Sequence, residues 1–357
     1  MIQRILVSAV AILTVYLAHA DNISFADAVV KALCIQHWDT DDDEELSMEE
    51  AAAVTTLGGV FRENKEIASF DELQFFTGLT SIDDYAFYKS TVQKVAFPAT
   101  VTAIGEYAFS ESNIGSELRV PGTVKEIKNY AFYNCRSLAS VVLEEGVEIV
   151  GWHTFSGPIT TMVLPRSLTF IKSMGVDPYV NANSSSGIFL PDGDLWVFAR
   201  AEEPAPINDF AFYYVYGDGH LVVPSGCVDA YKGVLGWSQF REYLEMGDVN
   251  TDGSVNHFDV VLLRDYLDGK DVELKNDLLA DVNGDGVSDE QDYEELKDRV
   301  YIDDGAPTMI AEAETKEQSV PEGVYTIDGR KVLDDVSQLH ILRPGIYIVN
   351  GKKVVVK

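Results

Sequence analysis

Cysteine is scarce in this chain. Its 357 residues include three, Cys34, Cys135 and Cys227, an odd number at wide spacing. Such a set cannot make a disulfide framework, and it lacks the paired spacing of a zinc site. We therefore expect the three cysteines to be small buried apolar side chains.

Positive charge is also sparse. The chain has 27 Lys and Arg against 58 Asp and Glu, which gives a formal net charge of −31. No nucleic-acid partner is expected, because a phosphate backbone requires cationic side chains. Residues 39–50 carry eight acids and no base, and residues 247–301 carry sixteen acids and five bases. This clustering indicates cation sites rather than a general solubilising surface.

Catalytic signatures are missing as well. The histidines of the mature chain fall in unrelated segments, and no H-E-x-x-H, G-x-S-x-G or phosphate-binding loop occurs. We therefore predict that the protein is not an enzyme. A catalytic site distributed over a repeat surface is the alternative.

Long apolar runs are confined to the N-terminus. Arg4 precedes an apolar run over residues 5–17 and then Ala18-His19-Ala20. This pattern predicts a signal peptide over residues 1–20, cleaved near Asp21. The run is too short to span a bilayer, and an uncleaved membrane helix is the alternative. No transmembrane segment is expected after signal cleavage, so the protein is predicted to be secreted.

The main feature that the chain does have is a repeat. An Ile or Val followed five residues later by Phe recurs four times, with Phe spacings of 22, 23 and 23 residues. The pairs are Ile82/Phe87, Ile104/Phe109, Ile127/Phe132 and Val150/Phe155. Short alternating apolar runs between them predict one strand per coil, and coils must stack because one coil cannot bury its own apolar face. A β-rich solenoid with a terminal cap is predicted over residues 59–246.

Three of the four Phe follow Tyr-Ala, and Pro98, Pro121 and Pro165 close three of the strands. This pattern resembles the BspA-like leucine-rich repeat family over roughly residues 80–170, and a degraded copy follows at residues 208–224. The resemblance implies a surface adhesin or binding protein whose solenoid contacts an unknown macromolecular ligand. The period fails from about Ser173 to Pro206, which we interpret as an insertion, either at a binding face or merely tolerated.

An acidic loop divides residues 21–58. It resembles an EF-hand loop, with oxygen-bearing residues at the ligand positions 1, 3, 5, 7, 9 and 12. These are Asp39, Asp41, Asp43, Glu45, Ser47 and Glu50. Glu44 stands at position 6, where glycine is expected because the turn needs an unusual backbone dihedral. The resemblance implies calcium, and the alternative is a metal-free helical cap over the first coil.

Two further loops lie in residues 247–301, 33 residues apart, each with D-x-N-x-D-G spacing and each followed by an apolar helical run. Their candidate ligands are Asp248, Asn250, Asp252, Ser254, Asn256 and Asp259, and then Asp281, Asn283, Asp285, Val287, Asp289 and Asp292. This arrangement suits a hard cation that needs six to eight oxygen ligands, and predicts calcium as the cofactor.

The pair of loops resembles a type I dockerin, an all-α module of two loop–helix repeats. The resemblance implies that calcium folds the module and that a cohesin-type protein is its partner. In dockerins, positions 10 and 11 of each loop contact that partner. Here these positions are His257, Phe258, Glu290 and Gln291. The alternative for Glu290 and Gln291 is an ordinary solvated position.

Residues 302–321 are predicted to be a linker, and residues 322–357 a small C-terminal β module in which Asn350-Gly351 marks a hairpin. The module resembles the type IX sorting domain of secreted Bacteroidetes proteins, which implies an outer-membrane surface or extracellular location. The alternative is a β module that merely ends the chain.

The predicted fold class is thus multidomain, with a leucine-rich-repeat solenoid, a helical EF-hand-like cap, an all-α dockerin and a small β module. The predicted function is calcium-dependent adhesion or protein–protein interaction. The alternative is a non-catalytic or cryptic hydrolase subunit of a polysaccharide-degrading complex.

Overall fold

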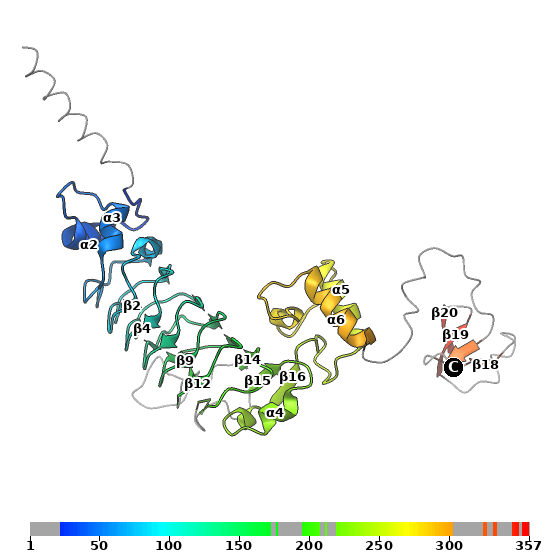
Figure 1. The fold of residues 1–357 in the computed structure, drawn as a ribbon. Helices are drawn as coiled ribbons and strands as arrows, with labels where there is room; N and C mark the ends of the chain where they lie inside the picture. The colour runs from blue at the N-terminus through cyan, green and yellow to red at the C-terminus, as the bar shows by residue number, and fades with distance from the viewer. Residues whose placement is uncertain are drawn as a thin grey trace, which may run out of the picture. The chain divides into compact units, whose positions relative to one another are not determined.

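The computed structural model describes residues 22–172, 176–177, 195–207, 211–212 and 219–302, together with four C-terminal strands. The chain divides into two compact units, residues 1–300 and 301–357 (Figure 1). The predicted signal peptide and all but the first residue of the predicted linker lie outside the described residues.

The first unit begins with two helices and continues as short strands. Its elements up to the last solenoid strand are α2 (Ala28–Trp38), α3 (Met48–Ala53), β1 (Ser69–Phe70), η1 (Asp71–Phe75), β2 (Ser81–Ile82), β3 (Lys94–Val95), β4 (Ala103–Ile104), β5 (Glu117–Val120), β6 (Glu126–Ile127), β7 (Phe132–Tyr133), β8 (Ser140–Leu143), β9 (Ile149–Val150), β10 (Phe155–Ser156), β11 (Thr161–Leu164), β12 (Phe170–Ile171), β13 (Val176–Asp177), β14 (Leu195–Ala199), β15 (Gly219–Val223), α4 (Val228–Lys232), η2 (Trp237–Gln239) and β16 (Glu242–Glu245).

These strands form a β-solenoid of parallel sheets. The largest sheet has six strands in the order β16-β15-β14-β11-β8-β5, and a second has five in the order β12-β9-β6-β4-β2. The register places equivalent repeat positions side by side, as in the row Leu118, Val141 and Met162. Each strand therefore hydrogen-bonds to its counterpart in the next coil, and the predicted repeat architecture is confirmed.

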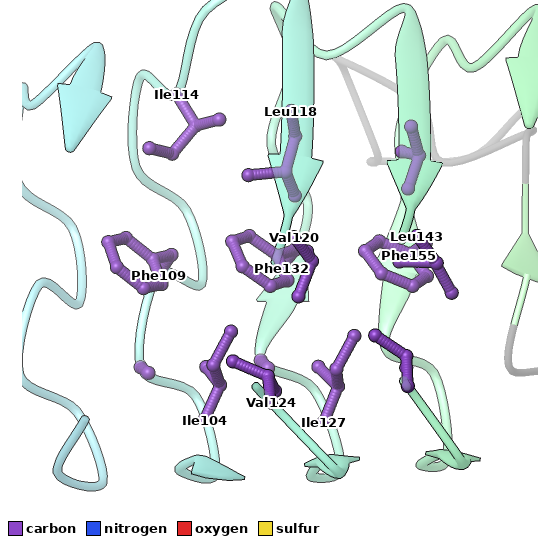
Figure 2. Packing of buried hydrophobic residues seen from close by; sticks show 14 of the residues in the cluster. Ile104, Phe109, Ile114, Leu118, Val120, Val124, Ile127, Phe132, Leu143 and Phe155 are labelled. Carbon is purple, nitrogen blue, oxygen red and sulfur yellow. The ribbon is translucent and has the colours of Figure 1, made fainter. Parts of the chain in front are cut away.

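The repeated Ile and Phe positions form a continuous core (Figure 2). The four Phe side chains are buried, and successive rings lie nearly parallel with centroids 4.9, 5.1 and 5.5 Å apart. Stacked aromatic pairs add about 0.5–1.5 kcal/mol each beyond the burial of their apolar area. The Ile and Phe of each coil therefore form the apolar face that stacking of the coils buries, as the repeat predicts.

A second aromatic column runs along the solenoid beside the core. The rings of Tyr85, Tyr107 and Tyr130 stack at 4.9 and 4.7 Å, and His153 continues the column at 5.3 Å. All four residues have a left-handed φ between 50° and 62°. The same uncommon backbone turn thus recurs in each coil, at a residue with a large side chain.

The predicted interruption at 173–206 is too long. Leu195–Ala199 forms β14, and its Val197 pairs with Met162 on one side and Leu221 on the other. This strand lacks the alternation of the other coils because all five of its residues are buried. It is covered on both faces, which favours a continuous apolar run over an alternating one.

The end of the solenoid and the cysteines complete the description of the core. Trp237 and Phe240 are buried at the last coil, where η2 is a three-residue 3₁₀ turn and Phe240 follows it in an extended conformation. Cys34 and Cys135 are buried as expected, whereas Cys227 is partly exposed.

The helices α2 and α3 pack at the N-terminal end of the same core. Val30, Cys34 and Leu46 are buried in it, and the Trp38 ring lies 5.4 Å from that of Phe76. Asp27 begins α2 as its N-cap, and its second carboxylate oxygen accepts a hydrogen bond from the Ala68 backbone N–H. The helical segment is thereby joined to the first coil through both apolar and polar contacts.

The rest of the first unit is helical and packs on the six-stranded sheet. It comprises α5 (His257–Leu267), η3 (Asp277–Ala280) and α6 (Glu290–Ile302). A second apolar cluster joins the two parts. It contains Val163, Trp196, Phe198, Val222, Leu244, Met246 and Leu279, with Val142 and Leu278 partly buried against it. The outward face of the sheet is therefore covered where β11, β14, β15 and β16 lie.

The second unit contains one antiparallel sheet in the order β18-β17-β19-β20. Its strands are β17 (Val324–Thr326), β18 (Lys331–Leu333), β19 (Gly345–Val349) and β20 (Lys352–Val356). Val349 pairs with Lys352, as a two-residue hairpin connection requires, and Asn350 and Gly351 themselves lie outside the described residues. Among the helices that the structure describes, none is long and apolar enough to cross a membrane.

Candidate functional site

The three acidic loops share one backbone conformation. In each, positions 4 and 6 have a left-handed φ. These residues are Asp42 (57°) and Glu44 (64°), Thr251 (56°) and Gly253 (87°), and Gly284 (74°) and Gly286 (93°). The unusual dihedral predicted for Glu44 is therefore present, and the loop keeps its turn without glycine.

The loops also share their internal hydrogen bonds. The backbone N–H of position 6 donates to the carboxylate of position 1 over 3.0, 2.9 and 3.0 Å in the three loops. The N–H of position 9 donates to the carboxylate of position 12 over 2.9, 2.8 and 2.9 Å. The first and last acids of each loop are thus held by backbone donors from within the loop.

In the N-terminal loop, carboxylate oxygens of Asp39, Asp41 and Asp43 all lie within 4.8 Å of one another. Desolvation and the carboxylates of Asp43 and Glu50 raise the pKa of Asp41. Asp39 Oδ1 is buried and has no hydrogen-bond partner. Three converging carboxylates repel one another, and this donor set fits a hard divalent cation.

The other predicted ligands of this loop lie differently. Ser47 is the N-cap of α3 and forms a capping box with Glu50. Burial acts to raise the pKa of Glu50, but hydrogen bonds from Ser47 and Thr40 outweigh it and lower the pKa to about 2. The Glu45 side chain pairs with Lys31 at 2.7 Å and does not join the cluster, so only its backbone carbonyl can serve at position 7.

The two C-terminal loops bury their first and last acids. Asp248, Asp259, Asp281 and Asp292 are between 0% and 7% exposed. Burial raises the pKa of Asp248, Asp259 and Asp281. In the described part of the chain, no cationic side chain forms a salt bridge with Asp248, Asp259 or Asp292. Buried carboxylates without a counter-charge are costly, so these loops fit a bound cation.

The remaining predicted ligands shape the loops through their side-chain oxygens. At positions 3 and 5 of each loop, the side-chain Oδ1 accepts a hydrogen bond from the backbone N–H two residues ahead. These residues are Asn250, Asp252, Asn283 and Asp285. Asn256 Oδ1 and Asp289 Oδ1 accept the N–H of Phe258 and Gln291, where the helices begin. The Val287 side chain is 57% exposed, so Val287, like Ser254 at the same position, would serve through its backbone carbonyl.

Comparison with known families agrees with this geometry. Residues 63–175 match the BspA type leucine rich repeat region in six copies. Residues 246–301 match the dockerin type I domain. The chain contains a BspA-type leucine-rich repeat region and a type I dockerin domain. No curated protein matches the chain.

The start of α5 presents apolar side chains on the dockerin surface. Phe258 is 70% exposed, and Val261, three residues further along the same helix, is 44% exposed. His257 lies beside Phe258 with ring centroids 6.1 Å apart. Sequence reasoning named His257 and Phe258 but missed Val261, which the i, i+3 spacing from Phe258 could have indicated.

The corresponding positions at the start of α6, Glu290 and Gln291, are polar, and Glu290 is engaged in an ion pair. Glu290 accepts two hydrogen bonds from Arg264, at 2.7 and 2.8 Å, across the two halves of the dockerin. Gln291 is exposed. The two halves of the dockerin therefore offer different surfaces, one apolar at α5 and one polar at α6.

Sequence reasoning also missed Arg200, which directly follows β14. Its Nη2 lies 3.0 Å from Oδ2 of Asp281, and both side chains are largely buried. The one available signal was the uniformly apolar strand Leu195–Ala199, which indicates a sheet face covered by another part of the chain.

Proposed function

We propose that this protein is a secreted, non-catalytic, calcium-binding interaction protein. Its dockerin docks onto a cohesin-type partner, and its solenoid binds a macromolecular ligand. The observation that carries the proposal is the pair of dockerin loops with buried carboxylates, the first of which leads into an exposed apolar surface at the start of α5. Neighbouring exposed apolar side chains, here Phe258 and Val261, are the kind of surface that a protein–protein contact buries.

Calcium would be held in each dockerin loop by side-chain oxygens at positions 1, 3, 5, 9 and 12 and by the carbonyl at position 7. It would neutralise Asp248, Asp259, Asp281 and Asp292 in their buried places. We propose the same role for Asp39, Asp41, Asp43 and Glu50 in the N-terminal loop, which resembles an EF-hand and covers the first coil. Calcium binding and folding of these loops are then one coupled equilibrium.

The C-terminal β module is proposed to direct export to the outer-membrane surface or the medium, as its resemblance to type IX sorting domains implies. The signal peptide and the dockerin fit the same extracellular setting. In this setting, docking through the dockerin and ligand binding by the solenoid would reinforce each other through high local concentration.

The proposal is tested by binding of the mature chain, residues 21–357, to immobilised type I cohesin modules in calcium and in chelator. Binding is expected in calcium and should be lost in chelator, because the loops that position α5 need their cation. The double substitution Asp248→Ala and Asp281→Ala should abolish binding in calcium. Phe258→Ser should weaken it about tenfold or more, as expected for a central apolar contact.

Two matched controls accompany this experiment. Asp271→Ala removes an acid outside the loops, and Leu235→Ser removes an apolar side chain that is 60% exposed on the solenoid. Both should bind like the unmodified chain. Equal binding by Phe258→Ser and Leu235→Ser would overturn the α5 surface as the docking site, and binding that is indifferent to chelator would overturn the calcium requirement.

A further inference from the structure

Arg200 reaches from the solenoid into the second dockerin loop. Asp281, its partner, is position 1 of this loop, and the two side chains are 10% and 5% exposed. The Asp281 Oδ2 atom accepts from Arg200 Nη2 and from the Gly286 backbone N–H, each over 3.0 Å. Asp281 Oδ1 is buried and has no partner. One oxygen of the carboxylate is thus fixed while the other remains available.

The loop is shaped to admit the arginine. A Cβ atom added at Gly284 would lie 3.1 Å from Arg200 Nε and 3.3 Å from its Cδ. The guanidinium therefore packs directly against the loop backbone. Arg166, from the coil before, donates to the Asn283 carbonyl over 3.5 Å and to the Arg200 carbonyl over 3.3 Å.

The first loop has a different electrostatic environment. Asp248, its position 1, is 1% exposed and accepts hydrogen bonds from the backbone N–H groups of Asp252 and Gly253. No salt bridge to Asp248 occurs in the described part of the chain. Two loops with the same backbone therefore differ in whether the solenoid supplies a positive charge at position 1.

Apolar packing holds the second loop in place. Leu278 and Leu279 of η3, two to three residues before Asp281, lie against the cluster that contains Trp196, Phe198 and Val222. Met246, two residues before Asp248, belongs to the same cluster, so apolar packing also anchors the start of the first loop. What distinguishes the second loop is the ion pair of Asp281 with Arg200, which has no counterpart at Asp248 in the described residues.

We infer that Arg200 is a built-in counter-charge for the second dockerin loop, so that this loop keeps more of its structure on the solenoid without calcium than the first loop does. The inference rests on the proposed calcium binding by both loops. A buried carboxylate without a counter-charge is costly, and Arg200 removes this cost from Asp281. The second loop then keeps one buried acid without a cationic partner in the described residues, Asp292, whereas the first loop keeps two, Asp248 and Asp259. Calcium would then order the α5 surface without changing the attachment of the dockerin to the solenoid.

The test is amide hydrogen exchange of the mature chain, residues 21–357, in chelator and in calcium. In chelator, amides of η3 and of residues 281–286 should be protected, and those of residues 248–256 should exchange at least tenfold faster than in calcium. Arg200→Gln should lose at least about tenfold of the η3 protection in chelator, because it leaves Asp281 unpaired. Calcium should restore this protection.

The double variant Arg200→Gln with Asp281→Asn separates charge from packing. It removes both members of the pair and should regain protection of η3 in chelator. Arg119→Gln removes an exposed arginine on the same sheet, paired with Glu144 at 3.6 Å, and should change nothing. Unchanged amides in β8 and β11 would report that each variant keeps its solenoid.

Each outcome decides the inference. Equal η3 protection in chelator for Arg200→Gln and the unmodified chain would overturn it, and so would an unprotected second loop in the unmodified chain. If calcium slowed amide exchange in neither loop, the proposed calcium binding would be overturned instead. The chelator measurements distinguish these cases, because they do not involve the metal.

Discussion

Glu44 and Arg200 show which properties of single residues can be predicted from the sequence and which cannot. The sequence spacing placed Glu44 at the turn of an EF-hand-like loop, and its φ of 64° agrees. The role of Arg200 could not be predicted, because its partner lies 81 residues further along the chain. Ligand spacing is local and can be found in the sequence, whereas an ion pair between distant segments depends on the packing of the whole fold.

Glu50 gives a pH-dependent prediction at this scale. Its pKa is about 2 in the folded chain and 4.5 in its ordinary state. A lowered carboxyl pKa contributes stability that is complete above pH 4.5 and is lost as the pH falls from 4.5 to about 2. In chelator, the α2–α3 segment should therefore loosen over this range, and Glu50→Gln should make its stability less sensitive to pH there.

The measurement is fluorine NMR of fluorotryptophan-labelled protein under urea, which resolves Trp38 where it packs on Phe61 and Phe76. Glu49→Gln, at the exposed neighbouring position, is the control and should keep the unmodified pH profile. A Glu50→Gln profile as steep as that of the unmodified chain would contradict the assignment.

Strands of the solenoid could be predicted from the sequence where polar and apolar residues alternate along them. Glu117–Val120 alternates exposed and buried residues, and its strand was found from the sequence. Leu195–Ala199 does not alternate, and the sequence alone placed it in an insertion. The difference is physical, because the outer face of β14 packs on the dockerin and selects apolar residues there as well.

The spacing between coils also has a steric requirement. A Cβ atom added at Gly122 would lie 1.7 Å from the Glu145 carbonyl oxygen in the next coil, too close for any side chain. Gly122→Ala should therefore push two coils apart locally and destabilise the solenoid by about 1–3 kcal/mol. Chemical denaturation followed by circular dichroism measures this change.

Gly59→Ala is the matched substitution, since no atom lies within 4 Å of a Cβ added there. Its free energy of unfolding should stay within about 0.5 kcal/mol of the unmodified chain. If both variants unfolded at the same denaturant concentration, close approach at Gly122 would not be a constraint on coil spacing.

At the scale of the whole molecule, the modules could be identified from the sequence. The contact between the dockerin and the solenoid could not. The dockerin and the repeat region each carry a local motif, and both agree with known families. The packing of η3 on the solenoid sheet has no motif, because its residues come from five separated segments. Such a surface is defined only when the coils have stacked.

This packing predicts the behaviour of a truncated chain. A protein that ends at Glu245 would expose Trp196, Phe198 and Leu244, which are 8%, 4% and 2% exposed in the intact chain. A contiguous apolar patch of this kind promotes self-association. Sedimentation should show oligomers of the 21–245 protein, and a 21–302 protein that keeps the dockerin should remain monodisperse. Monodisperse 21–245 protein would contradict the role given to this cluster.

The stacked column of Tyr85, Tyr107 and Tyr130 has a consequence for how such chains change over time. The contact between one coil and the next is the same along the column, because Tyr stacks on Tyr and Ile pairs with Ile at each step. Duplication or loss of a gene segment of 22 or 23 codons between equivalent positions leaves the remaining junctions intact, whereas any other length puts the rings out of register. Recombination between repeats can thus change the number of coils, and so the length of the solenoid, without changing its two terminal segments.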